Sequence, residues 1–142
     1  MAEDRYRLEP VRDARERVET VRRGELASAI GDASVTEAGL ASASDRVSAA
    51  RARLTAALAA RDSAILAATL VRAERFIARC RRELEAARDA ELRARTAHDT
   101  RSDAVELARA TLVRARADRE VIERHFARWR DTQRKLAERR ED

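Results

Sequence analysis

The second half of the chain carries a heptad repeat that continues without interruption from Leu66 to the C-terminal region, and it constrains the fold more than any other feature. No glycine or proline falls within the repeat, so no residue there breaks a helix. Its apolar side chains recur at alternating steps of three and four residues, which places them on one stripe of a helix. Such a stripe needs a partner, because a long isolated helix is not stable in water. We therefore predict one helix of about 75 residues, roughly 110 Å long, that pairs along this stripe.

Polar residues interrupt the stripe at four positions: Glu91, His98, Arg101 and Arg119. Buried polar residues set register and orientation in coiled coils, and this is the role that we expect here. Arg101 is expected to face Gly24 and Glu25, which offer space and a counter-charge. The alternative is that these polar residues weaken the packing between the helices locally and allow the helices to bend. Cys80 occupies a d position, where we expect a small core side chain rather than a reactive thiol.

The first half of the chain carries a weaker version of the same repeat. Its members are Leu26, Ala29, Ala33, Leu40, Ala43, Val47, Ala50, Leu54 and Ala57. Upstream, Val11, Val18 and Val21 are offset by one residue, as a local hendecad-like step would produce. Pro10 fits the first turn of a helix, where its missing N–H costs nothing. A capping-box pattern just after Gly31 leaves a break or kink near that glycine as an alternative.

A turn is expected at about residues 59–65, because Asp62 and Ser63 are the best N-cap candidates between the two repeats. The prediction is an all-α fold, a long antiparallel two-helix coiled-coil hairpin that forms a single domain over residues 1–142. Helix 1 is expected at about 8–59 and helix 2 at about 65–139. With this turn, the numbers of facing residues add up to about 125.

The predicted register leaves the end of helix 2 without a partner. Helix 1 would end opposite Ile122, so that Phe126, Trp129 and Leu136 project beyond it. An exposed apolar stripe of this size marks an interaction site. A turn nearer Val71 would cover the stripe and remove this argument.

Charge and composition exclude several classes of protein. Charged residues make up 40% of the chain and aromatic residues 3%, which favours long helices over a compact globule with one large core. The net charge is +5, but basic and acidic residues alternate along the sequence. A nucleic-acid or acidic-membrane binder needs a contiguous basic stripe, so we expect no nucleic-acid partner.

The chain is expected to be cytoplasmic. Its N-terminal segment is charged and resembles no secretory leader, and its single cysteine cannot form an internal disulfide. The longest uncharged run, at residues 63–71, is far shorter than the roughly 20 residues that span a bilayer. We therefore expect no direct membrane insertion.

No catalytic arrangement of residues is visible. His98 and His125 are far apart in the sequence, and neither forms a metal-ligand pattern with Cys80. The carboxylates lie on helix surfaces with arginines three or four residues away, where they serve as ion pairs. The sequence therefore predicts no enzyme, with no catalytic residues, no metal and no cofactor.

Two terminal motifs carry a resemblance to a known family. The segment "YRLEPVRDARERVE" resembles the N-terminal signature of the FliJ/YscO family of flagellar and type III secretion export, in which an aromatic-x-Leu stretch leads into an Arg/Glu-rich helix. The ending "HFARWRDTQRKLAERRED" looks similar as well. The chain departs from the family in its high alanine content and in the glycines of its first helix.

The resemblance implies a monomeric, non-enzymatic stalk, peripherally associated with the membrane export apparatus. Its N/C-terminal end would insert into the hexameric export ATPase, and the protein would link that ring to the membrane export gate; export chaperones are a further implied partner. At the ATPase end the implied contact residues are Tyr6, Leu8, Arg12, Arg15, Phe126, Trp129, Arg130 and Arg134. At the turn end, towards the gate, they are Leu66, Leu70, Arg72 and Phe76. The alternative function is a self-associating coiled-coil scaffold.

Overall fold

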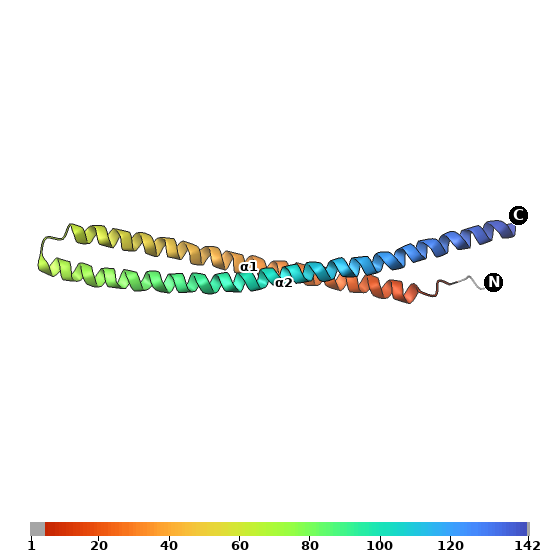
Figure 1. Cartoon of the computed structure of the whole chain (residues 1–142), viewed down its shortest axis with the longest axis horizontal. Coiled ribbons are helices and arrows are strands. Elements are labelled where there is room, and N and C mark those ends of the chain that lie inside the picture. Colours follow the sequence, from red (N-terminus) through yellow and green to blue (C-terminus); the bar gives the residue numbers. More distant parts are fainter. Residues whose placement is uncertain (1–4, 142) are drawn as a thin grey trace. The chain divides into compact units, whose positions relative to one another are not determined.

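The computed structural model describes residues 5–141, and these form two long helices. Helix α1 spans Glu9–Asp62 and helix α2 spans Ala67–Glu141, and the connection between them is only four residues long (Figure 1). The two helices pack against each other in antiparallel directions, and residues 5–141 contain no strand. The predicted all-α helical hairpin is therefore confirmed. Helix α1 continues through Gly31, so the break considered near that residue does not occur.

The hairpin divides into two compact units. The turn unit comprises Gly31–Asp103, and the terminal unit comprises residues 5–30 together with 104–141. In each unit a segment of α1 packs against a segment of α2.

The core of the turn unit is thin and rich in small side chains. One cluster joins Val47, Ala50 and Leu84, and the next joins Ala57, Ile77 and Cys80. Ile77 is completely buried and Cys80 is 1% exposed. All these residues belong to the predicted heptad stripes, so those stripes form the interface between the helices. Alanine layers allow the two helices to approach closely, because their side chains fill little space.

The register of the hairpin differs from the predicted one. Arg53 pairs with Glu83 at 2.8 Å and Arg61 with Glu74 at 3.4 Å, so the numbers of facing residues add up to about 135 rather than 125. Arg101 accordingly lies 3.7 Å from Asp32, and the prediction that it faces Gly24 and Glu25 is wrong. The position of the turn sets the pairing of every residue in a hairpin, so an error of about five residues in its centre shifts all facing pairs.

The physical reason for the shift lies at the connection. Asp62 and Ser63 were expected to cap α2, but they end α1 instead. The N–H and the hydroxyl of Ser63 both donate to the carbonyl of Ala60, at 3.3 and 3.1 Å. Helix α2 begins later, where the N–H of Leu70 donates to the carbonyl of Leu66 at 3.0 Å. The side chain of Ser63 is therefore used by the helix that precedes it.

In the terminal unit, α1 keeps the heptad phase of the turn unit. The interface positions are filled by Arg12, Arg15, Glu19 and Arg22. The prediction of a one-residue offset is wrong, because Val11, Val18 and Val21 are 39%, 48% and 58% exposed. Arg12 and Glu19 form ion pairs with α2 and Arg15 donates to the backbone carbonyl of Asp118, as described below, whereas Arg22 pairs with Glu25 on its own helix. The helix therefore does not need to change phase to bury its valines.

Candidate protein-binding surfaces

An aromatic cluster lies at the end of the terminal unit. The ring of Tyr6 is 5.0 Å from the ring of Phe126 and 5.2 Å from that of Trp129, and the latter two rings stack at 5.8 Å. The Tyr6 hydroxyl forms a hydrogen bond with Nδ1 of His125 at 2.8 Å. Tyr6 is only 5% exposed, which makes it the most buried aromatic residue of the cluster. Edge-to-face and tilted aromatic contacts of this kind stabilise beyond the area that they bury.

The predicted overhang of helix 2 is therefore only partly present. Phe126 and Trp129 were expected to have no partner in the chain, and this is wrong, because Tyr6 covers both. Tyr6, just before α1, packs against α2, because the shifted register brings it opposite Trp129. Leu136 remains 39% exposed. An open groove of about 830 Å³ runs along this end and is lined by Tyr6, Phe126, Trp129 and Leu136, among others.

Arginines surround the aromatic cluster. The guanidinium of Arg12 lies 4.3 Å from the centre of the Phe126 ring, and that of Arg130 lies 5.9 Å from it. Arg12 also donates to Glu123 at 2.8 Å, and this hydrogen bond raises the pKa of Arg12. Arg134 pairs with Asp131 on the same helix. A cation held over a ring face is attracted by the electron density of that face.

The eight residues implied for the ATPase end all lie in the terminal unit. Arg15 donates to the backbone carbonyl of Asp118 at 2.7 Å, and Leu8 is 38% exposed beside the start of α1. The structure brings Tyr6, Arg12, Phe126, Trp129 and Arg130 into one contiguous cluster.

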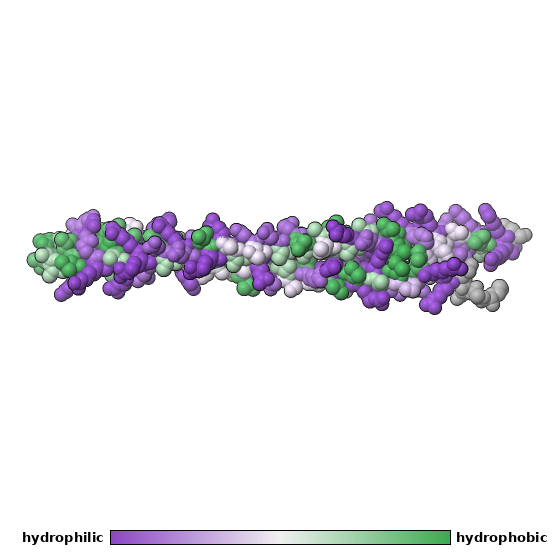
Figure 2. All heavy atoms as spheres, turned by 60° about the horizontal axis from the view of Figure 1, so that its bottom comes forward, coloured by the Kyte–Doolittle hydropathy of each residue, from purple (hydrophilic) through white to green (hydrophobic). Residues whose placement is uncertain are grey.

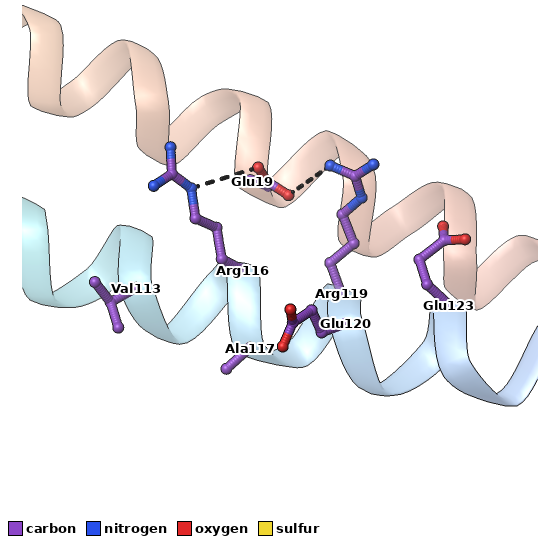
Figure 3. A pocket seen from close by; sticks show the side chains of 7 residues that line it. All are labelled: Glu19, Val113, Arg116, Ala117, Arg119, Glu120 and Glu123. Carbon is purple, nitrogen blue, oxygen red and sulfur yellow. Dashed lines mark hydrogen bonds and ion pairs between the residues drawn. The ribbon is translucent and has the colours of Figure 1, made fainter.

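A buried acidic residue, Glu19, forms an ion-pair network that the sequence reading missed. Its carboxylate accepts a hydrogen bond from Arg23 of the same helix at 2.7 Å. It also accepts one from Arg119 at 2.9 Å, and Arg116 lies 3.7 Å away (Figure 3). Glu19 is 4% exposed, the only buried charged residue in the described part of the chain. The hydrogen bond from Arg119 holds the pKa of the Glu19 carboxyl below its usual range, and the same bond raises the pKa of Arg119.

The arrangement around Glu19 is structural. Its carboxylate is bound by three guanidinium groups and is therefore a poor proton acceptor or nucleophile. Arg119 was recognised as a polar residue of the stripe, but its partner was not. The heptad phase of α1, extended upstream by seven residues from Leu26, places Glu19 at an interface position. This signal in the sequence indicates Glu19 as a partner for Arg119. A buried, fully paired charge of this kind specifies one register, since any other register leaves it unpaired.

The turn end of the turn unit exposes a group of apolar side chains. Ile65 is 96% exposed, Leu66 67%, Val71 53%, and Leu70 and Phe76 43% and 42%. Figure 2 shows hydrophobic residues gathered over this end. A shallow groove of about 610 Å³ lies beside them, between α1 near Ala57 and α2 near Ala73. The residues implied for the gate, Leu66, Leu70, Arg72 and Phe76, are all exposed here.

Comparisons of the chain with protein-family models, with curated proteins and with solved structures gave no match. The likeness to the FliJ/YscO family therefore rests on the two terminal motifs alone. Among residues 5–141, no group of three or more potential metal ligands is clustered. Neither α1 nor α2, over the same residues, contains a segment apolar enough to cross a bilayer.

Proposed function

We propose that the protein is a non-enzymatic stalk and adaptor of a type III protein export apparatus. Its terminal unit inserts into the hexameric export ATPase, and its turn end contacts the membrane export gate. It acts as a monomer at the cytoplasmic side of the membrane and also contacts export chaperones. The observation that carries the proposal is the cluster of Tyr6, Phe126 and Trp129 with Arg12 and Arg130, which combines both motifs of the resemblance into one surface.

The cluster has the composition of a protein-binding surface. Aromatic residues and arginine are enriched where proteins bind one another, and the strongest contacts come from such anchors. The groove beside Trp129 and Leu136 is open, so a partner can cover apolar surface that the chain itself leaves exposed. The other members of the cluster lie on α1 and α2, and Tyr6, just before α1, is held by its ring contacts with Phe126 and Trp129. This order in the free protein reduces the entropy lost on binding.

ATP turnover by the export ATPase, measured with and without this protein, tests the proposal. We expect faster turnover and a more stable hexamer with the intact chain, and loss of both effects with Trp129→Ala. Leu107→Ala is the matched control, because Leu107 is an apolar residue of the same unit that is 69% exposed and remote from the aromatic cluster. Unchanged turnover and ring mass with the intact chain would refute the ATPase role.

A self-associating scaffold is the second candidate, and one observation favours it. The exposed valines of α1, Val11, Val18 and Val21, form an apolar flank beside an open groove that includes Ala14. A second chain could bury this flank. Light scattering distinguishes the candidates: a dimer that Val18→Glu converts to a monomer supports the scaffold, and a monomer at all concentrations supports the stalk.

A further inference from the structure

The turn end concentrates the positive charge of the chain. Six arginines and two acidic residues fall between the Arg53–Glu83 ion pair and the turn, at residues 54–82. Both acidic residues, Asp62 and Glu74, pair with the same arginine, Arg61. The other arginines have no acidic partner within 4 Å in the described structure; they are Arg72, Arg75, Arg79, Arg81 and Arg82.

Four of these arginines form a stripe on one face of α2. Arg72, Arg75, Arg79 and Arg82 follow one another at steps of three, four and three residues, which places them on a single helical face. All four are exposed, and the buried Ile77 lies on the opposite side of the helix. In the sequence, Glu74 stands among these arginines, so that basic and acidic residues alternate. In the structure, Glu74 pairs with Arg61 of α1 and does not lie on the stripe. The contiguous basic surface that the sequence appeared to lack is therefore present in the fold.

Exposed apolar side chains continue the arginine stripe to the end of the hairpin. No charged residue occurs from Ser63 to Val71, and within this run Ile65 is 96% exposed and Leu66 67%. On α2, Phe76 lies beside the stripe, with the guanidinium of Arg79 5.7 Å from its ring centre. In addition, α2 has no acidic residue in its first turn, so the positive end of its helix dipole is not neutralised there.

We propose that the turn end binds the surface of anionic lipid bilayers. Ile65 and Leu66 insert among the headgroups, and the four arginines of the stripe contact lipid phosphates. Adjacent basic residues and exposed apolar side chains are the combination that holds proteins at an anionic lipid interface. Binding is at headgroup depth, consistent with the absence of a spanning segment in residues 5–141.

The geometry favours a lipid surface over an acidic protein helix seated in the neighbouring groove. That groove is lined by residues such as Ala56, Ala60 and Phe76, but by none of the four arginines. A helix in the groove would leave the stripe unused. A layer of headgroups contacts the stripe and the apolar end at the same time. This proposal does not depend on the role assigned to the terminal unit.

Flotation of the full chain with lipid vesicles tests the proposal. We expect binding to vesicles with about 30% phosphatidylserine, little binding to pure phosphatidylcholine, and a steep loss of binding as salt is raised. The variant Arg72→Gln/Arg75→Gln/Arg79→Gln should bind about 100-fold more weakly, since each arginine near an anionic surface contributes about fivefold.

A matched variant separates the stripe from net charge. Arg88→Gln/Arg93→Gln/Arg95→Gln removes the same charge from exposed positions of α2 in the same unit and should bind within about threefold of the intact chain. Ile65→Ser/Leu66→Ser should weaken binding, whereas Leu92→Ser, at another exposed leucine, should not. Circular dichroism verifies that each variant stays helical.

Four outcomes would overturn the proposal. Three concern vesicles: no binding to anionic vesicles, equal losses in the two triple variants, and binding that is the same on neutral vesicles. If the stripe variant loses only its binding to an acidic protein partner, the surface is a protein contact and the lipid assignment is wrong. The stripe variant should still stimulate the ATPase. A failure of the lipid proposal can therefore be distinguished from a failure of the stalk proposal.

Discussion

Tyr6→Ala should open the aromatic cluster of the terminal unit. The substitution removes a side chain that is 5% exposed, its 2.8 Å hydrogen bond with His125, and its ring contacts with Phe126 and Trp129. Aromatic-to-alanine changes in a core cost about 3–5 kcal/mol. Tyr6 precedes α1, where the backbone can relax into the space. We therefore expect the lower end of that range, about 3 kcal/mol, in the free energy of unfolding.

Trp129 makes this prediction measurable at the site itself, because it is the only tryptophan in the chain. Loss of the Tyr6 ring exposes the indole to water, so its fluorescence emission should move to longer wavelength in the native protein. The urea midpoint should fall at the same time.

Tyr6→Phe is the matched control, since it keeps the ring and removes only the hydroxyl that bonds to His125. It should cost about 1 kcal/mol and leave the emission of Trp129 unchanged. If Tyr6→Ala alters neither the emission nor the urea midpoint, then Tyr6 does not cover the cluster in solution, and the end of α2 is as open as the sequence suggested.

Three further predictions concern the two helices. Ile77→Ala, at the fully buried position of the turn unit, should lower the free energy of unfolding by about 2–5 kcal/mol in urea titrations. Glu19→Gln should weaken the pH dependence of stability: the folded-state pKa of Glu19 is lowered, so its contribution is complete above the unfolded-state pKa and is lost as pH falls through the folded value. An acid titration with the same slope in both proteins would contradict this. Gly31→Ala should raise the melting temperature through a gain of up to about 1 kcal/mol, because an added Cβ meets no atom within 4 Å; a lower melting temperature would refute it.

The heptad repeat predicted the buried centre of the turn-unit interface but not where it ends, since Leu66 and Leu70 belong to the repeat and are 67% and 43% exposed. Ile77, Cys80 and Leu84 are apolar, evenly spaced and free of competing signals, so their burial follows from periodicity alone. The register could not be predicted in the same way. It depends on whether Ser63 ends one helix or begins the next, and a serine hydroxyl can do either.

The terminal unit was harder to predict because its interface is charged. Val11 and Val18 form an apolar pattern one residue away from the observed heptad phase. Hydrophobicity alone therefore predicts the valines, and not Arg12 and Glu19, at the interface. The structure selects Arg12 and Glu19 because each finds a partner on α2, Glu123 and Arg119 respectively. Pairing across a hairpin is a property of two distant segments, and a local pattern carries no information about it. The same limit explains why the cover that Tyr6 provides for Trp129 was missed.

The ion pairs of Glu19 also have a mechanical consequence. If α1 slid along α2 by one heptad in the terminal unit, the Glu19 carboxylate would leave Arg119 and meet Leu112 or Phe126, which occupy the same heptad position. Both are apolar, so a shift of one heptad in either direction leaves the Glu19 carboxylate opposite an apolar side chain instead of Arg119. A pulling or pushing force along the helices therefore meets a barrier to slippage rather than smooth sliding. Within this unit the two helices should transmit axial load as a single strut.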